Sequence, residues 1–182
     1  MKNIIIVLLV LIIVVLVLGF FVFDVFRPMS PQTTVVTSFA ECLAAGNPVM
    51  ESYPRQCKSA DGKSFTEDIG NELEKDDLIR IESPRPNATV ASPLKVTGSA
   101  RGTWFFEASF PVRITDSNGV ELGVVPAQAQ GEWMTEEFVR FEATLPFKAP
   151  TTDTGYLILE KDNPSGLPEH ADELKIPIMF SR

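Results

Sequence analysis

Few side chains in this sequence combine the type and the spacing that catalysis requires. His170 is the only histidine, and it lies in the polar run LPEHADE, where a solvated loop is expected. A serine hydrolase needs its nucleophile on a strained turn, and no Gly-x-Ser-x-Gly motif is present. The adjacent carboxylates Glu136-Glu137 and Asp76-Asp77 are typical of a solvated surface, and no Gly-rich phosphate-binding loop occurs. The sequence therefore predicts a protein that is not an enzyme.

Oxygen-rich turns are the places where a metal ion would have to bind. Asp116-x-Asn118-Gly and Asp162-Asn163 offer side-chain oxygens of the kind that calcium prefers. Neither follows the calcium-loop pattern that ends in a glutamate. Asp and Asn are also the residues that form tight turns. We therefore predict neither a metal nor a small-molecule cofactor.

Cys42 and Cys57 are the only two cysteines, and fourteen residues separate them. Gly46-Asn47-Pro48 and Tyr53-Pro54 lie between them and fold the chain back on itself. A disulfide that closes such a loop stabilises it by about 3 kcal/mol in the chain-entropy model. A zinc site would need histidines nearby, and a reactive thiol would need a basic neighbourhood that the sequence does not show. We predict a structural Cys42–Cys57 disulfide, which indicates an oxidising compartment.

The N-terminal segment is the strongest topological signal in the chain. Ile4 to Phe23 is an unbroken apolar run of twenty residues without a polar face. As a helix it would span about 30 Å, the thickness of the hydrocarbon core of a bilayer. A cleaved signal peptide is the alternative, but the run is long for one and no small-x-small cleavage site follows it. We predict an uncleaved transmembrane signal anchor that places residues 4–23 in the membrane.

The rest of the chain is acidic and is expected to face away from the cytoplasm. Only Lys2 among the charged residues precedes the apolar run, so 24 acidic and 15 basic residues follow it, a net charge of −9. Phosphate backbones repel such a chain, and therefore nucleic acid is not an expected partner. Because almost nothing precedes the run and the cysteines favour oxidation, we predict a single-pass protein of the cell membrane with an extracytoplasmic C-terminal domain.

Changes in composition divide the chain into successive segments. A Pro, Ser and Thr-rich stretch follows the anchor, then the cysteine loop, then the charged run NELEKDD, and from Leu78 onward short alternating runs separated by turn residues. The predicted boundaries are an anchor over 1–25, a stalk linker over 26–41, a small cysteine-loop segment over 42–69, an acidic spacer over 70–77, and a β-sandwich over 78–182.

The last of these segments shows the period-2 alternation of half-buried strands. In one run the apolar side chains that share a face are Phe106, Ala108, Phe110, Val112 and Ile114. Similar alternation begins at Leu94, Val139 and Leu174, and Tyr156–Leu159 is apolar throughout. About seven short strands without a long helical run predict an all-β fold, an antiparallel immunoglobulin-like β-sandwich.

The aromatic cluster GTWFFEASF leaves two interpretations open. The alternation predicts that Phe106 and Phe110 lie in the core. Trp104 and Phe105 precede the alternating run, and Trp133 and Met134 lie in an expected loop before another strand. These four side chains either form a lid over one end of the sandwich or, if they cluster, a candidate binding surface, because exposed aromatic residues are enriched in recognition sites.

Several long runs carry a resemblance to a known family. They are SPRPNATVASPLKVTGSARGTWFFEASFPVRITDSNG, GEWMTEEFVRFEATLPF and GYLILEKDNPSGLPEHADELKIPIMF. The region from about Ile79 to Phe180 resembles the immunoglobulin-like domain of bacterial spore-germination and sporulation-associated proteins. The resemblance implies a β-sandwich in an extracytoplasmic protein, used for binding or assembly at the envelope, and it provides no catalytic residues.

We therefore expect a membrane-anchored binding or structural module of the bacterial cell envelope. Its partner is expected to be an envelope protein or a cell-wall polymer. The alternative is an accessory or inhibitor of a cell-wall enzyme or protease that acts through the Cys42–Cys57 loop. The run from Tyr53 to Glu67 resembles a short portion of Kazal-type protease inhibitors, a family that has six cysteines where this chain has two.

Overall fold

The computed structural model describes residues 35–181, and within this range residues 38–181 belong to one compact unit. The anchor predicted over residues 4–23 lies outside the described residues. None of the helices between residues 35 and 181 has the length and apolar character needed to cross a membrane.

The cysteine-loop segment folds into a small module of its own. Its elements are the helix α2 (Phe39–Ala44) and the antiparallel strands β1 (Val49–Met50), β2 (Gln56–Lys58) and β3 (Ser64–Thr66), in the order β1-β2-β3. Ser38 caps α2 by accepting a hydrogen bond from the backbone N–H of Glu41 at 3.2 Å. The predicted Cys42–Cys57 disulfide is confirmed, and it joins α2 to β2 with both side chains fully buried.

The acidic spacer carries more structure than its composition indicates. It contains the short helix α3 (Glu72–Lys75), and the residues before that helix follow the edge of strand β11 (Glu173–Phe180). Asn71 donates its backbone N–H to the carbonyl of Lys175 at 3.2 Å, and its side-chain oxygen accepts from the Lys175 N–H at 2.7 Å. Gly70 has φ +68° and approaches so closely that a Cβ would lie 1.9 Å from the Lys175 carbonyl oxygen. The segment is therefore docked on the strand.

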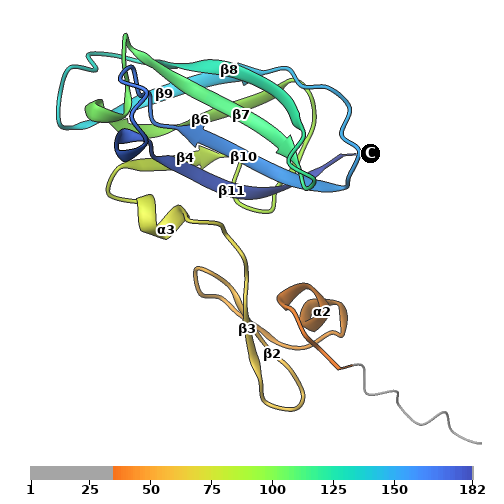
Figure 1. Ribbon diagram of the computed structural model, residues 1–182. Coiled ribbons are helices and arrows are strands. Elements are labelled where there is room, and N and C mark those ends of the chain that lie inside the picture. The colour runs from red at the N-terminus through yellow and green to blue at the C-terminus, as the bar shows by residue number, and fades with distance from the viewer. Residues whose placement is uncertain (1–34, 182) are drawn as a thin grey trace, which may run out of the picture. The chain divides into compact units, whose positions relative to one another are not determined.

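The remaining strands form one eight-stranded sheet (Figure 1). They are β4 (Ile79–Ser83), β5 (Thr89–Val90), β6 (Leu94–Arg101), β7 (Ser109–Asp116), β8 (Glu121–Ala129), β9 (Phe138–Leu145), β10 (Thr154–Glu160) and β11, with the single-turn 3₁₀ helices η1 (Gly102–Trp104) and η2 (Pro168–His170). Their spatial order is β4-β6-β9-β8-β7-β10-β11-β5.

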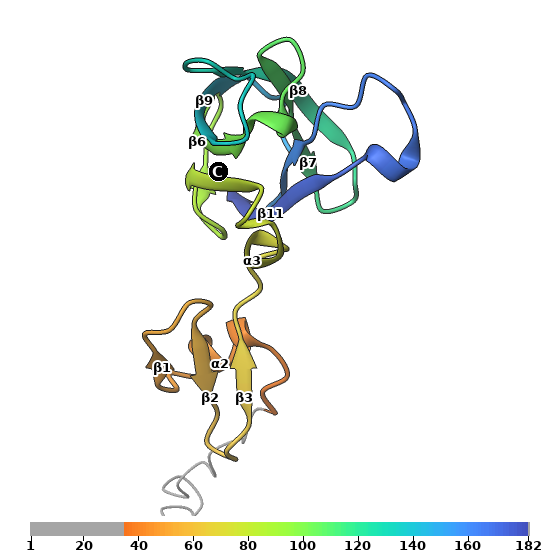
Figure 2. The same ribbon diagram turned by 90° about the vertical axis from the view of Figure 1, so that its left-hand side faces the viewer.

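The all-β prediction is confirmed, with one difference in connectivity. The sheet is mixed, because β5 pairs with β11 in the parallel direction, whereas a wholly antiparallel sandwich of about seven strands was expected. Strands β8 and β9 pair through only two register positions, Gln128 with Glu142 and Ala129 with Phe141. The sheet curls where β8 and β9 meet, so that β4-β6-β9 and β8-β7-β10-β11 enclose one core (Figure 2).

The alternating runs supply that core, as predicted. Val96, Phe110, Phe141, Leu157 and Ile176 are buried members of five different strands. The ring of Phe110 meets that of Phe141 edge to face, with 4.9 Å between the centroids.

The prediction that Phe106 lies in this core is wrong. The side chain is 42% exposed, because β7 begins at Ser109 and not at Phe106. Phe106 and Ser109 pair across a tight reversal in which Glu107 (φ 48°) and Ala108 (φ 61°) adopt left-handed backbone conformations. The reversal breaks the alternation two residues before the strand, and it turns Phe106 outward.

Candidate functional site

Three loops lie at one end of the sandwich, the end that faces the viewer in Figure 2, where the loop between β10 and β11 extends away from the other two. They comprise residues 102–108 after β6, 130–137 between β8 and β9, and 161–172 between β10 and β11. The backbone N–H of Asp162 donates to the Trp104 carbonyl at 3.0 Å, and that of Ala129 donates to the Ala108 carbonyl at 2.8 Å. A Cβ on Gly102 would lie 2.2 Å from the Trp133 carbonyl oxygen. The first loop is thus in contact with both of the others.

Trp104 and Phe105 face inward at this end. Their side chains are 1% and 5% exposed, and both belong to the main hydrophobic core. The ring of Phe105 lies 5.1 Å from that of Phe110, edge to face. Within the described residues the Trp104 indole N–H has no hydrogen-bond partner. Burial of this kind favours the lid interpretation for these two residues, because a side chain that solvent does not reach cannot present a binding surface.

Trp133 and Met134 face the solvent to different degrees. Trp133 is half-buried and packs against the core, whereas Met134 is 74% exposed. Bonds within and beside the loop hold it in place: the Met134 N–H donates to Glu132 Oε1 at 3.2 Å, and Arg101 Nη1 donates to the Glu136 carbonyl at 3.2 Å. The four candidate residues therefore do not form one exposed cluster.

A groove at this end of the sandwich is the part of the candidate site that the sequence did not predict. The groove has a volume of about 570 Å³ and is lined by Pro111, Glu160–Asn163 and Ala171–Glu173. Glu160 is held at one wall by Arg113, whose Nε donates to Glu160 Oε1 at 2.9 Å. The Asp162-Asn163 pair was visible in the sequence as a turn, but Asp172 joins it only because β10 and β11 are neighbours. A groove of this chemistry accepts hydrogen bonds from a donor-rich ligand.

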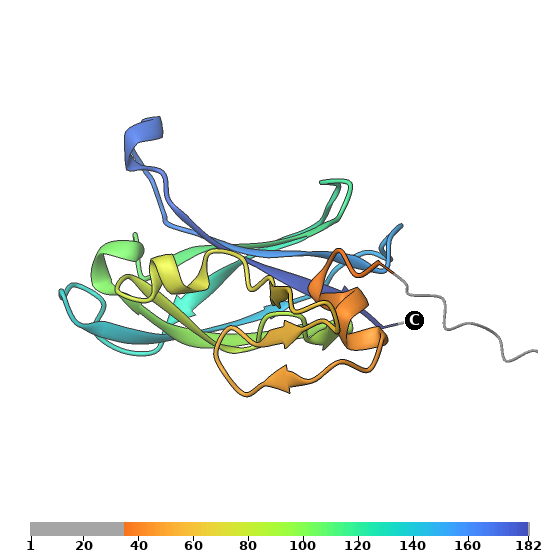
Figure 3. The ribbon, with the colours of Figure 1, turned by 90° about the horizontal axis from the view of Figure 1, so that it is seen from below.

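His170 lies in η2, in the long loop that joins β10 to β11 (Figure 3). Its Nδ1 is 3.0 Å from Ser165 Oγ, and Ser165 also bonds Asn163 Oδ1 at 2.6 Å. All of these contacts lie in an exposed segment, which is the solvated setting that the sequence predicted for this histidine. Between residues 35 and 181 no group of three His, Cys, Asp or Glu side chains is arranged to hold a metal ion.

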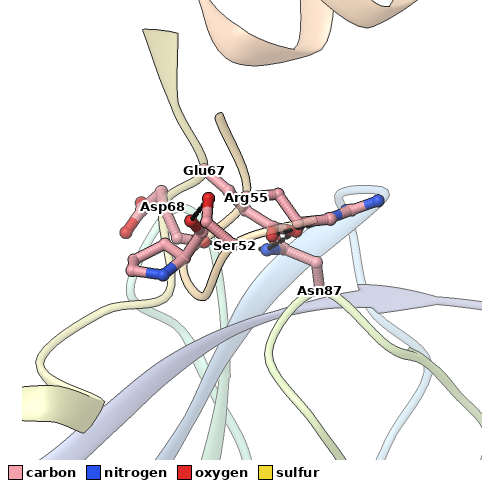
Figure 4. Close-up of polar contacts among 6 residues, drawn as sticks. Ser52, Arg55, Glu67, Asp68 and Asn87 are labelled. Carbon is pink, nitrogen blue, oxygen red and sulfur yellow. Dashed lines mark hydrogen bonds and ion pairs between the residues drawn. The ribbon is translucent and has the colours of Figure 1, made fainter. Parts of the chain in front are cut away.

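Two polar clusters attach the cysteine module to the sandwich. In the first, shown in Figure 4, Arg55 forms a bidentate ion pair with Glu67, at 2.5 Å between Nη2 and Oε1. Asn87, in the loop between β4 and β5, donates its amide to Glu67 Oε1 at 3.2 Å and to the Asp68 carbonyl at 2.8 Å. The Glu67 carboxylate thus receives donors from both parts of the chain.

The second cluster centres on Glu72 of α3, which is also buried. Arg85 Nη1 pairs with Glu72 Oε1 at 2.6 Å, and Arg85 Nη2 donates to the Tyr53 hydroxyl at 2.6 Å. The Tyr53 hydroxyl in turn donates to Glu72 Oε2. Tyr53 of the module is therefore bonded to both Glu72 and Arg85 in this second cluster.

Glu67→Gln is expected to weaken this attachment and to change its pH dependence. The hydrogen bonds from Arg55 hold the pKa of Glu67 below its ordinary value. A lowered pKa in the folded state contributes stability above the ordinary glutamate pKa, and this stability is lost as the pH falls through the lowered value. We expect the variant to lose about 1–3 kcal/mol of module stability at neutral pH and to show a flatter acid limb in unfolding curves measured from pH 7 to pH 3. Identical curves for the variant and the wild type would contradict the role given to Glu67.

Comparison with known families assigns residues 78–166, which make up most of the sandwich. The family model described as the immunoglobulin-like domain of bacterial spore germination matches residues 78–166. The resemblance expected from the sequence is thereby confirmed over most of the sandwich. No curated protein and no solved structure matches this chain.

Proposed function

Because residues 78–166 carry the immunoglobulin-like domain of bacterial spore germination, we propose that this chain is an extracytoplasmic binding or structural module of the bacterial cell envelope. The family match is the observation that carries the proposal. The predicted anchor over residues 4–23 holds the module at the membrane, and the C-terminal domain faces away from the cytoplasm.

Two features of the described residues support this location. The buried Cys42–Cys57 disulfide suits an oxidising compartment, which is where disulfides form and persist. The end of the sandwich where three loops meet is the kind of surface that sandwiches with clustered loops use for recognition. The matched family is in general not catalytic, and a binding role without chemistry agrees with it.

Fractionation of a bacterial host that produces the full-length chain tests the location. We expect the wild type in the membrane pellet, with its C-terminal domain degraded when protease is added to spheroplasts. Leu11→Asp combined with Val14→Asp is expected to release the chain from the pellet and leave Cys42 and Cys57 reduced, since each charge costs about 3 kcal/mol at the centre of a membrane helix. A matched control carries Leu11→Val and Val14→Leu and should behave as the wild type. Wild-type chain in the soluble cytoplasmic fraction would refute the proposal.

Binding is tested with the immobilised full-length chain. We expect several-fold retention of a detergent-solubilised envelope protein or of purified cell-wall polymer over the bare matrix. The alternative function, inhibition or assistance of an enzyme through the cysteine loop, is separated by repeating the capture with Cys42→Ser/Cys57→Ser. Retention that disappears with the disulfide assigns the contact to the module, and retention that persists assigns it to the sandwich.

A further inference from the structure

We propose that the three-loop end of the sandwich, formed by residues 102–108, 130–137 and 161–172, is a docking surface for a basic, partly apolar segment of a partner protein. The inference rests on the proposed binding function and names the surface and the partner chemistry that this function uses.

Exposed apolar side chains make the first part of the surface. Met134 is 74% and Phe106 is 42% exposed, and Trp133 is half-buried and packs against the core. The loops that carry these side chains are neighbours. The backbone of Gly102 closely approaches that of Trp133, and the Ala129 N–H, next to the second loop, donates to the Ala108 carbonyl. Methionine is unbranched and polarizable and adapts to different partners, and tryptophan and phenylalanine give large contact areas. These side chains can bury apolar surface against a partner without unfolding the core.

Charge decides what kind of partner fits. The three loops together carry seven carboxylates against one lysine, a net charge of −6 with His170 neutral. The carboxylates are Glu107, Glu132, Glu136, Glu137, Asp162, Glu169 and Asp172. Flanking cations offset two of them, since Lys75 pairs with Asp172 at 2.5 Å and Arg101 lies 4.0 Å from Glu137. Complementary charge favours a basic segment and repels anionic polymers.

The groove next to these loops provides room for the basic side chains. It has a volume of about 570 Å³, enough for more than one long side chain, and Asp162, Asn163 and Glu173 line it with hydrogen-bond acceptors. Lys and Arg carry only donors at their ends, with an apolar stem that lies along Pro111 and Ala171. The groove and the apolar side chains thus favour the same occupant, a segment in which basic and apolar residues are mixed.

The intrinsic fluorescence of the full-length chain reports on this surface directly. The chain has two tryptophans, of which Trp104 is buried and Trp133 is partly exposed at the proposed contact. The probes are synthetic twelve-residue peptides of alternating Lys and Leu, and of alternating Glu and Leu as the acidic counterpart. We expect the basic peptide to shift the emission to shorter wavelength and to bind more weakly as salt is added, and the acidic peptide to leave the spectrum unchanged.

Matched variants test whether the binding is local. Glu136→Lys/Glu137→Lys changes two exposed loop charges, and Glu51→Lys/Glu74→Lys makes the same change in net charge at exposed positions outside the three loops. We expect the first variant to bind the basic peptide about tenfold more weakly and the second to bind within about twofold of the wild type. Met134→Ser should weaken binding several-fold without a change in melting temperature, because the side chain is mostly exposed.

Equal losses in the two charge variants, or tighter binding of the acidic peptide, would overturn the proposal. Capture of purified cell-wall polymer that depends on Met134 and on Glu136 would assign the surface to a polymer and would also overturn it. In each of these cases the envelope location and the capture described above can still hold, so failure of the docking surface is distinguishable from failure of the proposed function.

Discussion

Trp104→Ala is expected to reduce the free energy of unfolding of the sandwich by about 3–5 kcal/mol. Among residues 35–181 the indole is the largest fully buried side chain, at 1% exposure, and it belongs to the main core, against which Trp133 also packs. Its removal leaves a cavity that the surrounding strands cannot collapse to fill, because β6 and β7 are fixed on both sides by paired strands. Equilibrium unfolding in urea, followed by circular dichroism, measures the loss as a shift of the midpoint at constant slope.

Trp104→Phe is the matched control for this effect. It keeps an aromatic ring in the core and removes the indole N–H, which has no hydrogen-bond partner within the described residues. We expect a loss clearly smaller than that of the alanine variant, because the cavity is smaller and an unpaired buried donor is removed at the same time. An alanine variant with unchanged stability but weaker peptide binding would contradict the lid interpretation and would return Trp104 to the binding surface.

Removal of the disulfide is expected to unfold the cysteine module while the sandwich stays folded. Cys42 and Cys57 are fully buried, and the only other buried apolar side chain between residues 38 and 69 is Ile69. A unit this small has almost no core without its crosslink. Cys42→Ser/Cys57→Ser removes about 3 kcal/mol of chain-entropy stabilisation and places two hydroxyls in the buried site. We expect amide hydrogens of α2, β2 and β3 to exchange rapidly in the variant.

Amide hydrogens of β6, β7 and β9 serve as the internal reference in that experiment. They lie in the sandwich core and should keep their wild-type protection. Slow exchange in β2 of the double variant would show that Arg55, Glu67 and Asn87 suffice to hold the module, and the disulfide would then be dispensable for its fold. Loss of protection in β7 as well would show that the module and the sandwich unfold as one unit.

The sequence predicted the strands well where one face of the strand is buried, because apolar and polar side chains then alternate strictly. Val96, Phe141 and Ile176 are buried because every second residue of a half-buried strand faces the core, a pattern that needs no knowledge of the partner strand. The same rule failed at Phe106, where two non-glycine residues in left-handed conformations reverse the chain before the strand begins. Periodicity does not reveal such a reversal, because Glu107 and Ala108 are not residues that normally mark one.

The candidate site was harder to predict, since its parts come together only through topology. Trp133 was recognised as a loop residue, but its distance from Trp104 depends on β9 lying beside β6. The groove requires β10 and β11 to form a hairpin with β7 alongside, and none of its residues is unusual in the sequence by itself. The run over 70–77 was predicted only as an acidic spacer, whereas its Glu72 is buried with Arg85 and Tyr53 as partners that are distant along the chain.

The segment around Gly70 and Asn71 also affects whether separate copies of this protein can associate through their sheets. A strand whose backbone N–H and C=O groups are unpaired along one side can pair with strands of other chains. Strand β5 pairs only with Met179 and Phe180 of β11. The stretch Glu173–Pro177 of β11 would therefore be open on that side. Asn71 forms hydrogen bonds with the backbone of Glu173 and Lys175 on that side. The backbone N–H of Asn87 donates a hydrogen bond to the carbonyl of Pro177. The short stretch that joins the module to the sandwich thereby covers an edge at which strands of other copies of the chain could pair.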